Sequence, residues 1–119
     1  MDVLHVAIDV VDIETERRFY EEVLGLHKTR DFEVDGQYNY CVGGESPAQI
    51  QFVEVEEKGD PAGINHLSVG VTGMDDVVAE ATDEWDCELE RGPMTVGDEA
   101  KIAFVTDPEG YAVELIEEL

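Results

Sequence analysis

Internal repetition is the feature that most constrains the fold of this chain. Hydrophobic patterning predicts a strand, a helix and three strands in residues 1–56, and a strand, a helix and further strands in residues 64–119. The segment between them, 57–63, is polar and carries Gly and Pro, which is typical of a boundary. A length of 119 residues suits one domain. We therefore expect a single domain over 1–119 that consists of two diverged halves.

In the first half, cap and turn signals separate the elements. Asp12 is expected to cap a helix over 13–24, whose apolar residues form one face, and Gly25 is expected to end it. The Asp35-Gly36 pair is typical of a tight hairpin turn. The predicted strands of this half occupy residues 3–11, 27–34, 38–42 and 48–55.

The second half ends in a predicted hairpin. Asp107 to Gly110 has the residue order of a type I turn, and apolar segments flank it. In the outgoing strand Glu114 shares a face with apolar neighbours, and a carboxylate in such surroundings needs an ionic partner or a metal. Upstream of the hairpin we expect a strand over 64–71, a helix over 73–84, a short strand or turn over 85–89, and a Gly- and Pro-containing connection over 92–97.

Two polar residues recur at equivalent places in the two halves. The opening strands align His5 (LHVAIDV) with His66 (NHLSVGV). The closing strands align Gln51 (AQIQFVEV) with Glu114 (YAVELIEE). Alone, a histidine on an apolar strand is more often a core residue than a ligand, and Gln51 is an ordinary half-exposed strand residue. Together, two imidazoles, an amide oxygen and a carboxylate suit a divalent first-row metal with positions open for substrate.

Three stretches of the sequence carry a family resemblance. They read LHVAIDVVDIETERRFYEEVLGL near the start, GINHLSVGV in the middle and IAFVTDPEGYAVELIE near the end. On these stretches the chain resembles the vicinal-oxygen-chelate (VOC) superfamily, and its closing motif is most similar to glyoxalase I. The resemblance implies an α+β architecture of paired βαβββ modules, the glyoxalase/bleomycin resistance/dioxygenase fold, with mixed curved sheets and with modules at 1–56 and 64–119.

The resemblance also implies a site and a reaction. It implies one divalent metal ion (nickel, cobalt, zinc, iron or manganese) in a homodimer that shares its metal sites between chains. The implied ligands are His5, Gln51, His66 and Glu114. The implied activity is that of a glyoxalase I-type lyase or isomerase, which acts on a small-molecule adduct of a 2-oxoaldehyde and a thiol through an enediolate. Because Gln51 cannot take up a proton at neutral pH, Glu114 is the expected general base as well as a ligand.

Other activities on this fold stay open. Extradiol dioxygenase or thiol transferase chemistry would use His5, His66 and Glu114 and leave Gln51 as a bystander, and epimerase chemistry also fits the quartet. A further alternative is a non-enzymatic module that binds a small molecule, although such members typically lose the ligands. The chain departs from many glutathione-using glyoxalases at Asp9, where they often have an Arg that holds a substrate carboxylate. The thiol carrier is therefore also open.

The charge balance restricts the partners and the setting. The chain has 30 acidic and 7 basic residues, a net charge of -23, and the acids run through its whole length. This excess disfavours nucleic acid and anionic membranes, and it fits either a simple solvated surface or halophilic adaptation to molar salt, which we favour. Cys41 and Cys87 stand alone, as expected of small core residues in a reducing cytoplasm. Neither a signal peptide nor a membrane span is expected.

Overall fold

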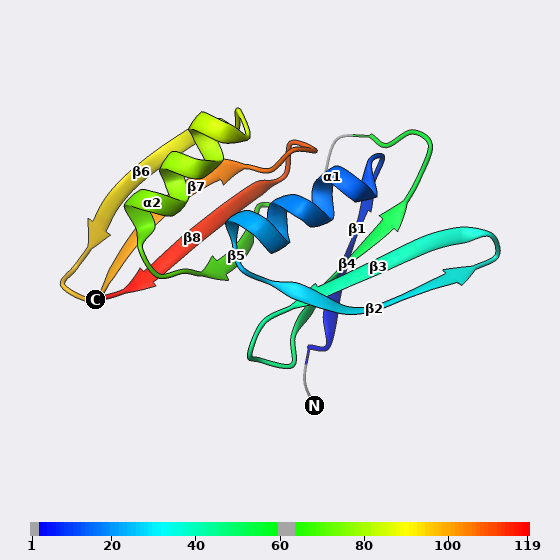
Figure 1. The fold of residues 1–119 in the computed structure, drawn as a ribbon. Helices are drawn as coiled ribbons and strands as arrows, with labels where there is room; N and C mark the ends of the chain where they lie inside the picture. Colours follow the sequence, from blue (N-terminus) through cyan, green and yellow to red (C-terminus); the bar gives the residue numbers. More distant parts are fainter. Residues whose placement is uncertain (1–2, 60–63) are drawn as a thin grey trace. The chain divides into compact units, whose positions relative to one another are not determined.

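The predicted repeat is present as two units that share one order of elements. The computed structural model describes residues 3–59 and 64–119, which divide into the units Met1–Asp60 and Pro61–Leu119. Each unit contains a four-stranded sheet and one helical segment (Figure 1). The predicted boundary segment, 57–63, includes residues 60–63, which lie outside the described residues. That the two modules form a single domain stays a prediction.

The first unit has the strand order β1-β4-β3-β2. Its strands are β1 (His5–Val10), β2 (His27–Val34), β3 (Gln37–Gly43) and β4 (Gln49–Glu54). β1 pairs in parallel with β4, and the other two pairs are antiparallel, so the sheet is mixed as expected. Helix α1 (Ile13–Arg18) continues into a π-helical turn, η1 (Phe19–Val23). The predicted elements of this half are confirmed, with small differences at their ends.

Local signals in the sequence explain where these elements begin and turn. The Asp12 carboxylate accepts the backbone N–H of Thr15 at 3.1 Å, which caps the first turn of α1. Hydrogen bonding from the Thr15 hydroxyl and N–H lowers the pKa of Asp12 below its usual range. Asp35 and Gly36 both adopt positive φ, as the tight turn between β2 and β3 requires.

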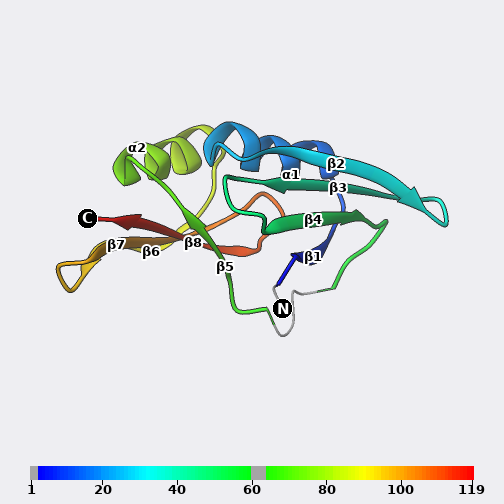
Figure 2. The ribbon, with the colours of Figure 1, turned by 90° about the horizontal axis from the view of Figure 1, so that it is seen from below.

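The helical segment covers one face of its sheet. Figure 2 shows α1 on one side of β3 and β4. The rings of Tyr20 and Phe52 lie 5.2 Å apart between the two layers. The buried apolar side chains of this layer are Ile8, Val10, Ile13, Phe19, Tyr20, Val23, Tyr40, Val42 and Phe52. Because side chains alternate along a strand, the residues between these positions in β1, β3 and β4 point away from the helix.

The second unit repeats this arrangement in the order β5-β8-β7-β6. Its strands are β5 (Leu67–Gly70), β6 (Leu89–Val96), β7 (Ala100–Thr106) and β8 (Ala112–Glu118). β5 pairs in parallel with β8, as β1 does with β4. Helix α2 (Met74–Ala79) and the π-helical turn η2 (Glu80–Glu84) lie on one face of this sheet (Figure 2). Among the described residues, no helix is long and apolar enough to cross a membrane.

The sequence prediction was wrong at β6. We expected a short strand or turn over 85–89 and a connection over 92–97, but a single strand, β6, begins at the last residue of the first range, runs through most of the second and pairs with β7. β6 lies at the edge of its sheet, and its pairing changes register across Gly92 and Pro93. Proline, which has no N–H to donate, is tolerated at edges and bulges of this kind. The Gly92-Pro93 pair, which predicted a connection, therefore lies in a bulge of an edge strand.

The closing hairpin is confirmed. The backbone N–H of Gly110 donates to the carbonyl of Asp107 at 3.0 Å, which closes the predicted four-residue turn. In β8, Val113 and Leu115 are fully buried, and Glu114 lies on the opposite face. Cys41 and Cys87, expected as core residues, are both buried and form no disulfide.

Candidate metal centre

In the first unit, the two predicted ligands lie on neighbouring strands and on one face. His5 begins β1 and is exposed, and Gln51 lies in β4 and is half-buried. The Cα partner of Gln51 in β1 is Ala7, two residues after His5. Paired residues of parallel strands share a face, and positions two apart do so as well, so His5 and Gln51 both project from the face opposite α1.

In the second unit, the two predicted ligands are in contact. His66 Nε2 lies 3.3 Å from Glu114 Oε1, and the side chains are 32% and 17% exposed, so an ion can reach them. The Ser68 hydroxyl donates to the same carboxylate oxygen at 2.9 Å. The His66 ring stands edge-on to Phe104, with centroids 5.4 Å apart. The carboxylate that the sequence showed to need a partner thus has two.

The register of the two parallel strand pairs makes these placements equivalent. Glu114 pairs with Ser68, two residues after His66, just as Gln51 pairs with the residue two after His5. The sequence alignment of the halves therefore holds residue by residue at these positions.

The hydrogen bonding of His66 suits this pair to a cation. His66 Nδ1 lies 2.6 Å from the Asn65 side-chain oxygen, which only accepts, so Nδ1 carries the proton. Nε2 is then the ring nitrogen that faces the Glu114 carboxylate, and either a proton or a metal ion can lie between the two atoms.

The predicted quartet is divided between the units. Over residues 3–59 and 64–119, no three His, Cys, Asp or Glu side chains gather into a metal-binding group. Each unit instead holds two of the four predicted ligands, one imidazole and one carboxylate or amide. A complete set of the four predicted ligands therefore needs the pair from a first unit together with the pair from a second unit.

Sequence reasoning missed the polar side chains that form hydrogen bonds with the predicted ligands. Ser68 could have been found, because it lies two residues after His66 on the same face and next to the closing strand. Asn39 accepts a hydrogen bond from Gln51 at 2.9 Å. That contact depends on how β3 registers against β4, and the sequence carries no local signal for it.

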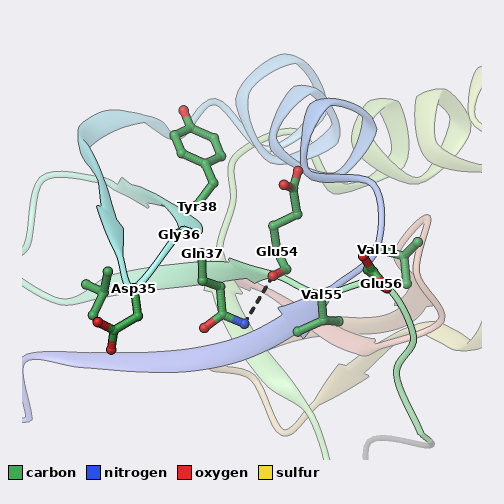
Figure 3. A pocket seen from close by; sticks show the side chains of 9 residues that line it. Val11, Asp35, Gly36, Gln37, Tyr38, Glu54, Val55 and Glu56 are labelled. Carbon is green, nitrogen blue, oxygen red and sulfur yellow. Dashed lines mark hydrogen bonds between the residues drawn. The ribbon is translucent and has the colours of Figure 1, made fainter.

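A pocket in the first unit lies apart from the predicted ligands. It has a volume of about 780 Å³ and is lined by Val11, Val34, Asp35, Tyr38, Glu54 and Glu56, among others (Figure 3). The Tyr38 hydroxyl donates to Asp31 at 2.9 Å. Burial, and then this bond, raises the pKa of Tyr38 to about 12, so its hydroxyl stays protonated at neutral pH.

The sequence model of the Glyoxalase/Bleomycin resistance protein/Dioxygenase superfamily matches residues 2–115. The chain belongs to this superfamily. Within the superfamily, it is 33% identical, over an alignment of 132 positions, to the lactoylglutathione lyase of Haemophilus influenzae, a match that covers 98% of this chain and 93% of that protein. It is 34% identical, over an alignment of 134 positions, to the lactoylglutathione lyase of Escherichia coli O157:H7, with 99% of this chain and 93% of that protein covered.

Solved structures of the superfamily agree with this assignment. The trypanothione-dependent glyoxalase I of Leishmania major superposes with a TM-score of 0.79 at 26% identity and covers 98% of this chain and 86% of its own. A glyoxalase/dioxygenase of Nostoc punctiforme reaches a TM-score of 0.80 at 22% identity, with 99% and 91% covered, which supports the fold. The predicted superfamily and the α+β fold of paired βαβββ modules are confirmed. The comparisons support an enzyme, a lyase of the predicted glyoxalase I type.

Proposed function

We propose that this chain is a divalent-metal-dependent lyase of glyoxalase I type, which converts an adduct of a 2-oxoaldehyde and a thiol through an enediolate. One observation carries the proposal: His66 Nε2 and Glu114 Oε1, an imidazole nitrogen and a carboxylate oxygen, face each other at 3.3 Å. The relatives that are lactoylglutathione lyases support the reaction class.

The ligands proposed for the metal are His5 and Gln51 from one kind of unit and His66 and Glu114 from the other. We propose a homodimer in which two chains share each site. When bound, the ion supplies a Lewis acid that polarises two substrate oxygens. Nickel, cobalt, zinc, iron and manganese all suit this donor set.

Glu114 is the residue proposed to move the proton between the two adjacent substrate carbons. It is the only carboxylate of the four, and Gln51 has no basic atom at neutral pH. The Ser68 hydroxyl, which donates to Oε1 at 2.9 Å, restrains the carboxylate in β8. Because side chains on a sheet are more rigid than side chains on loops, the base is held ready before substrate arrives.

The proposed thiol carrier is one other than glutathione. Asp9 lies in β1, where an Arg would be expected to hold a glutathione carboxylate, and the net charge of -23 repels anionic conjugates. The Leishmania major relative is trypanothione-dependent, so carriers differ within this group. We further propose that the enzyme works in the cytoplasm of a cell with molar internal salt, which would screen the acidic surface.

Substitution of Glu114 tests the proposal. The metal content of protein purified in high salt without chelator should be about one ion per chain, and turnover should be measured with 2-oxoaldehydes and a panel of thiols. Glu114→Gln should keep the metal at reduced affinity and lose turnover by about 10²–10⁴-fold, because the amide cannot accept the proton. Glu118→Gln makes the same charge change on the exposed end of β8 and serves as the control.

Three outcomes distinguish the alternatives. Full turnover in Glu114→Gln removes Glu114 from the role of base. Unchanged metal affinity and activity in Gln51→Ala would favour dioxygenase or transferase chemistry, in which Gln51 is a bystander. Protein that takes up no metal on reconstitution would favour a module that only binds a small molecule.

A further inference from the structure

An amide ligand has a difficulty that a carboxylate lacks. Gln51 can present either its oxygen, which binds a metal ion, or its NH₂ group, which cannot. Rotation by half a turn about the last side-chain bond exchanges the two. A glutamine that serves as a metal ligand therefore needs a neighbour that distinguishes its two ends.

Asn39 makes this distinction. Gln51 Nε2 donates to Asn39 Oδ1 at 2.9 Å, and Asn39 Nδ2 donates to the backbone carbonyl of Gln37 at 3.1 Å. Because a carbonyl only accepts, it fixes the NH₂ of Asn39 on that side and directs the Asn39 oxygen at Gln51. Gln51 must then donate with its own NH₂ group, and its Oε1 becomes the end turned away from Asn39. Asn39 is only 4% exposed, so water cannot easily replace these bonds.

The strand register builds this contact. The Cα partner of Gln51 in β3 is Cys41, and Asn39 lies two residues before it on the same face. Diagonal neighbours on one face of a sheet are within reach of long side chains. Gln37 is itself tied to β4, because its Nε2 donates to the Glu54 carbonyl at 3.2 Å. The series of hydrogen bonds from Gln51 through Asn39 to Gln37 therefore ends in a bond to the backbone of β4.

The second unit shows the complementary arrangement. Glu114 stands where the first unit has Gln51, and it accepts a hydrogen bond from Ser68. The position equivalent to Asn39 is Ile102, by the register of β7 and β8, and its side chain has no polar atom. Each unit thus gives its closing-strand residue the partner that its chemistry requires: an acceptor for the amide and a donor for the carboxylate.

We infer that Asn39 is a positioning residue that presents the Oε1 of Gln51 to the metal ion, an inference that rests on the proposed function. The same geometry disfavours a carboxylate at position 51. A glutamate there would direct an oxygen at Asn39 Oδ1, and turning Asn39 over would break its bond to the Gln37 carbonyl.

A pair of variants separates positioning from a merely structural role. Both Asn39→Leu and Asn39→Asp lose the NH₂ group that binds the Gln37 carbonyl, so both should lower the free energy of unfolding. Only Asn39→Asp keeps an oxygen that accepts from Gln51 Nε2. The dissociation constant of the full-length protein for Co²⁺ alone is measured by competition with a chromophoric chelator. It should rise about 10–100-fold in Asn39→Leu and stay at or below the wild-type value in Asn39→Asp.

A double-mutant cycle completes the test. In a Gln51→Ala background, Asn39→Leu should leave the Co²⁺ dissociation constant unchanged, because no amide remains to be oriented. Asn39→Ala replaces Asn39→Leu if the latter fails to fold. Wild-type affinity in Asn39→Leu, or equal losses in the Leu and Asp variants, overturns the inference while the proposed function stands. Wild-type protein that binds no Co²⁺ overturns the proposed function and this inference with it.

Discussion

At the scale of single residues, Asp107 determines the course of the closing hairpin. It is only 4% exposed. Its Oδ1 accepts the backbone N–H groups of Glu109 and Tyr111, each at 2.9 Å. These bonds fix where β8 begins after the turn. Since side chains alternate along the strand from that point, they also fix the face on which Glu114 lies.

Asp107→Ala should lower the free energy of unfolding by about 1–3 kcal/mol, because the buried N–H of Tyr111 loses its acceptor. Asp107→Asn keeps an oxygen in the place of Oδ1 and should retain most of the stability. Urea unfolding at fixed salt concentration measures both. Equal losses in the two variants would show that the negative charge of Asp107, rather than the acceptor oxygen, holds the turn.

The residues of the site differ in how far the sequence could predict them. The turn at Asp107 was predictable because Asp, Pro and Gly each favour one position of it. The contact between His66 and Glu114 agrees with the sequence argument, since a carboxylate among apolar side chains requires a partner. The Asn39 contact could not be predicted, because it depends on the register between two strands. The roles of the four residues as ligands stay predictions.

At the scale of elements, the bulge in β6 brings its backbone unusually close to β7. Gly92 has a φ of +80°, and a Cβ at this position would lie 2.6 Å from the carbonyl oxygen of Ile102 and 3.2 Å from Ala103 Cα. Both neighbours are backbone atoms of a paired strand and cannot move aside freely. Gly92 is therefore required for space as well as for its φ angle.

Gly92→Ala should lower the free energy of unfolding more than Gly97→Ala does. Gly97 also has a positive φ, +60°, but a Cβ there meets nothing within 4 Å. The control should cost about 1–2 kcal/mol for its backbone conformation, and the clash at Gly92 should add about 1–3 kcal/mol. Thermal unfolding of the two variants in one buffer makes the comparison. Equal effects would mean that the bulge has room for a side chain.

The same element shows why part of the fold escaped prediction. Gly and Pro in adjacent positions are a strong turn signal, and their local effect is the same in a loop and in a bulge. What distinguishes the two is that β6 lies at the edge of its sheet, with one side free of partners. Helix α1 was predictable because its cap and its apolar face are both local features.

At the scale of the whole molecule, the net charge of -23 should make stability depend strongly on salt. The Debye length falls from about 10 Å at 0.1 M salt to about 3 Å at 1 M, so repulsion among surface carboxylates is largely screened at molar concentrations. We expect the Tm to rise by more than about 10 °C between 0.1 and 2 M KCl. Sucrose at matched water activity leaves the charges unscreened and is the control. A Tm that does not rise with KCl would contradict halophilic adaptation.

The two units together account for the whole proposed site, because each supplies one imidazole and one oxygen ligand. The most direct measurement is an anomalous difference map from crystals of metal-loaded protein, collected at the absorption edge of the metal. We expect one peak per chain, bonded to His5, Gln51, His66 and Glu114, and the map will show whether two chains contribute them. A metal bound to other residues, or no peak with His66 and Glu114 still in direct contact, would contradict the account.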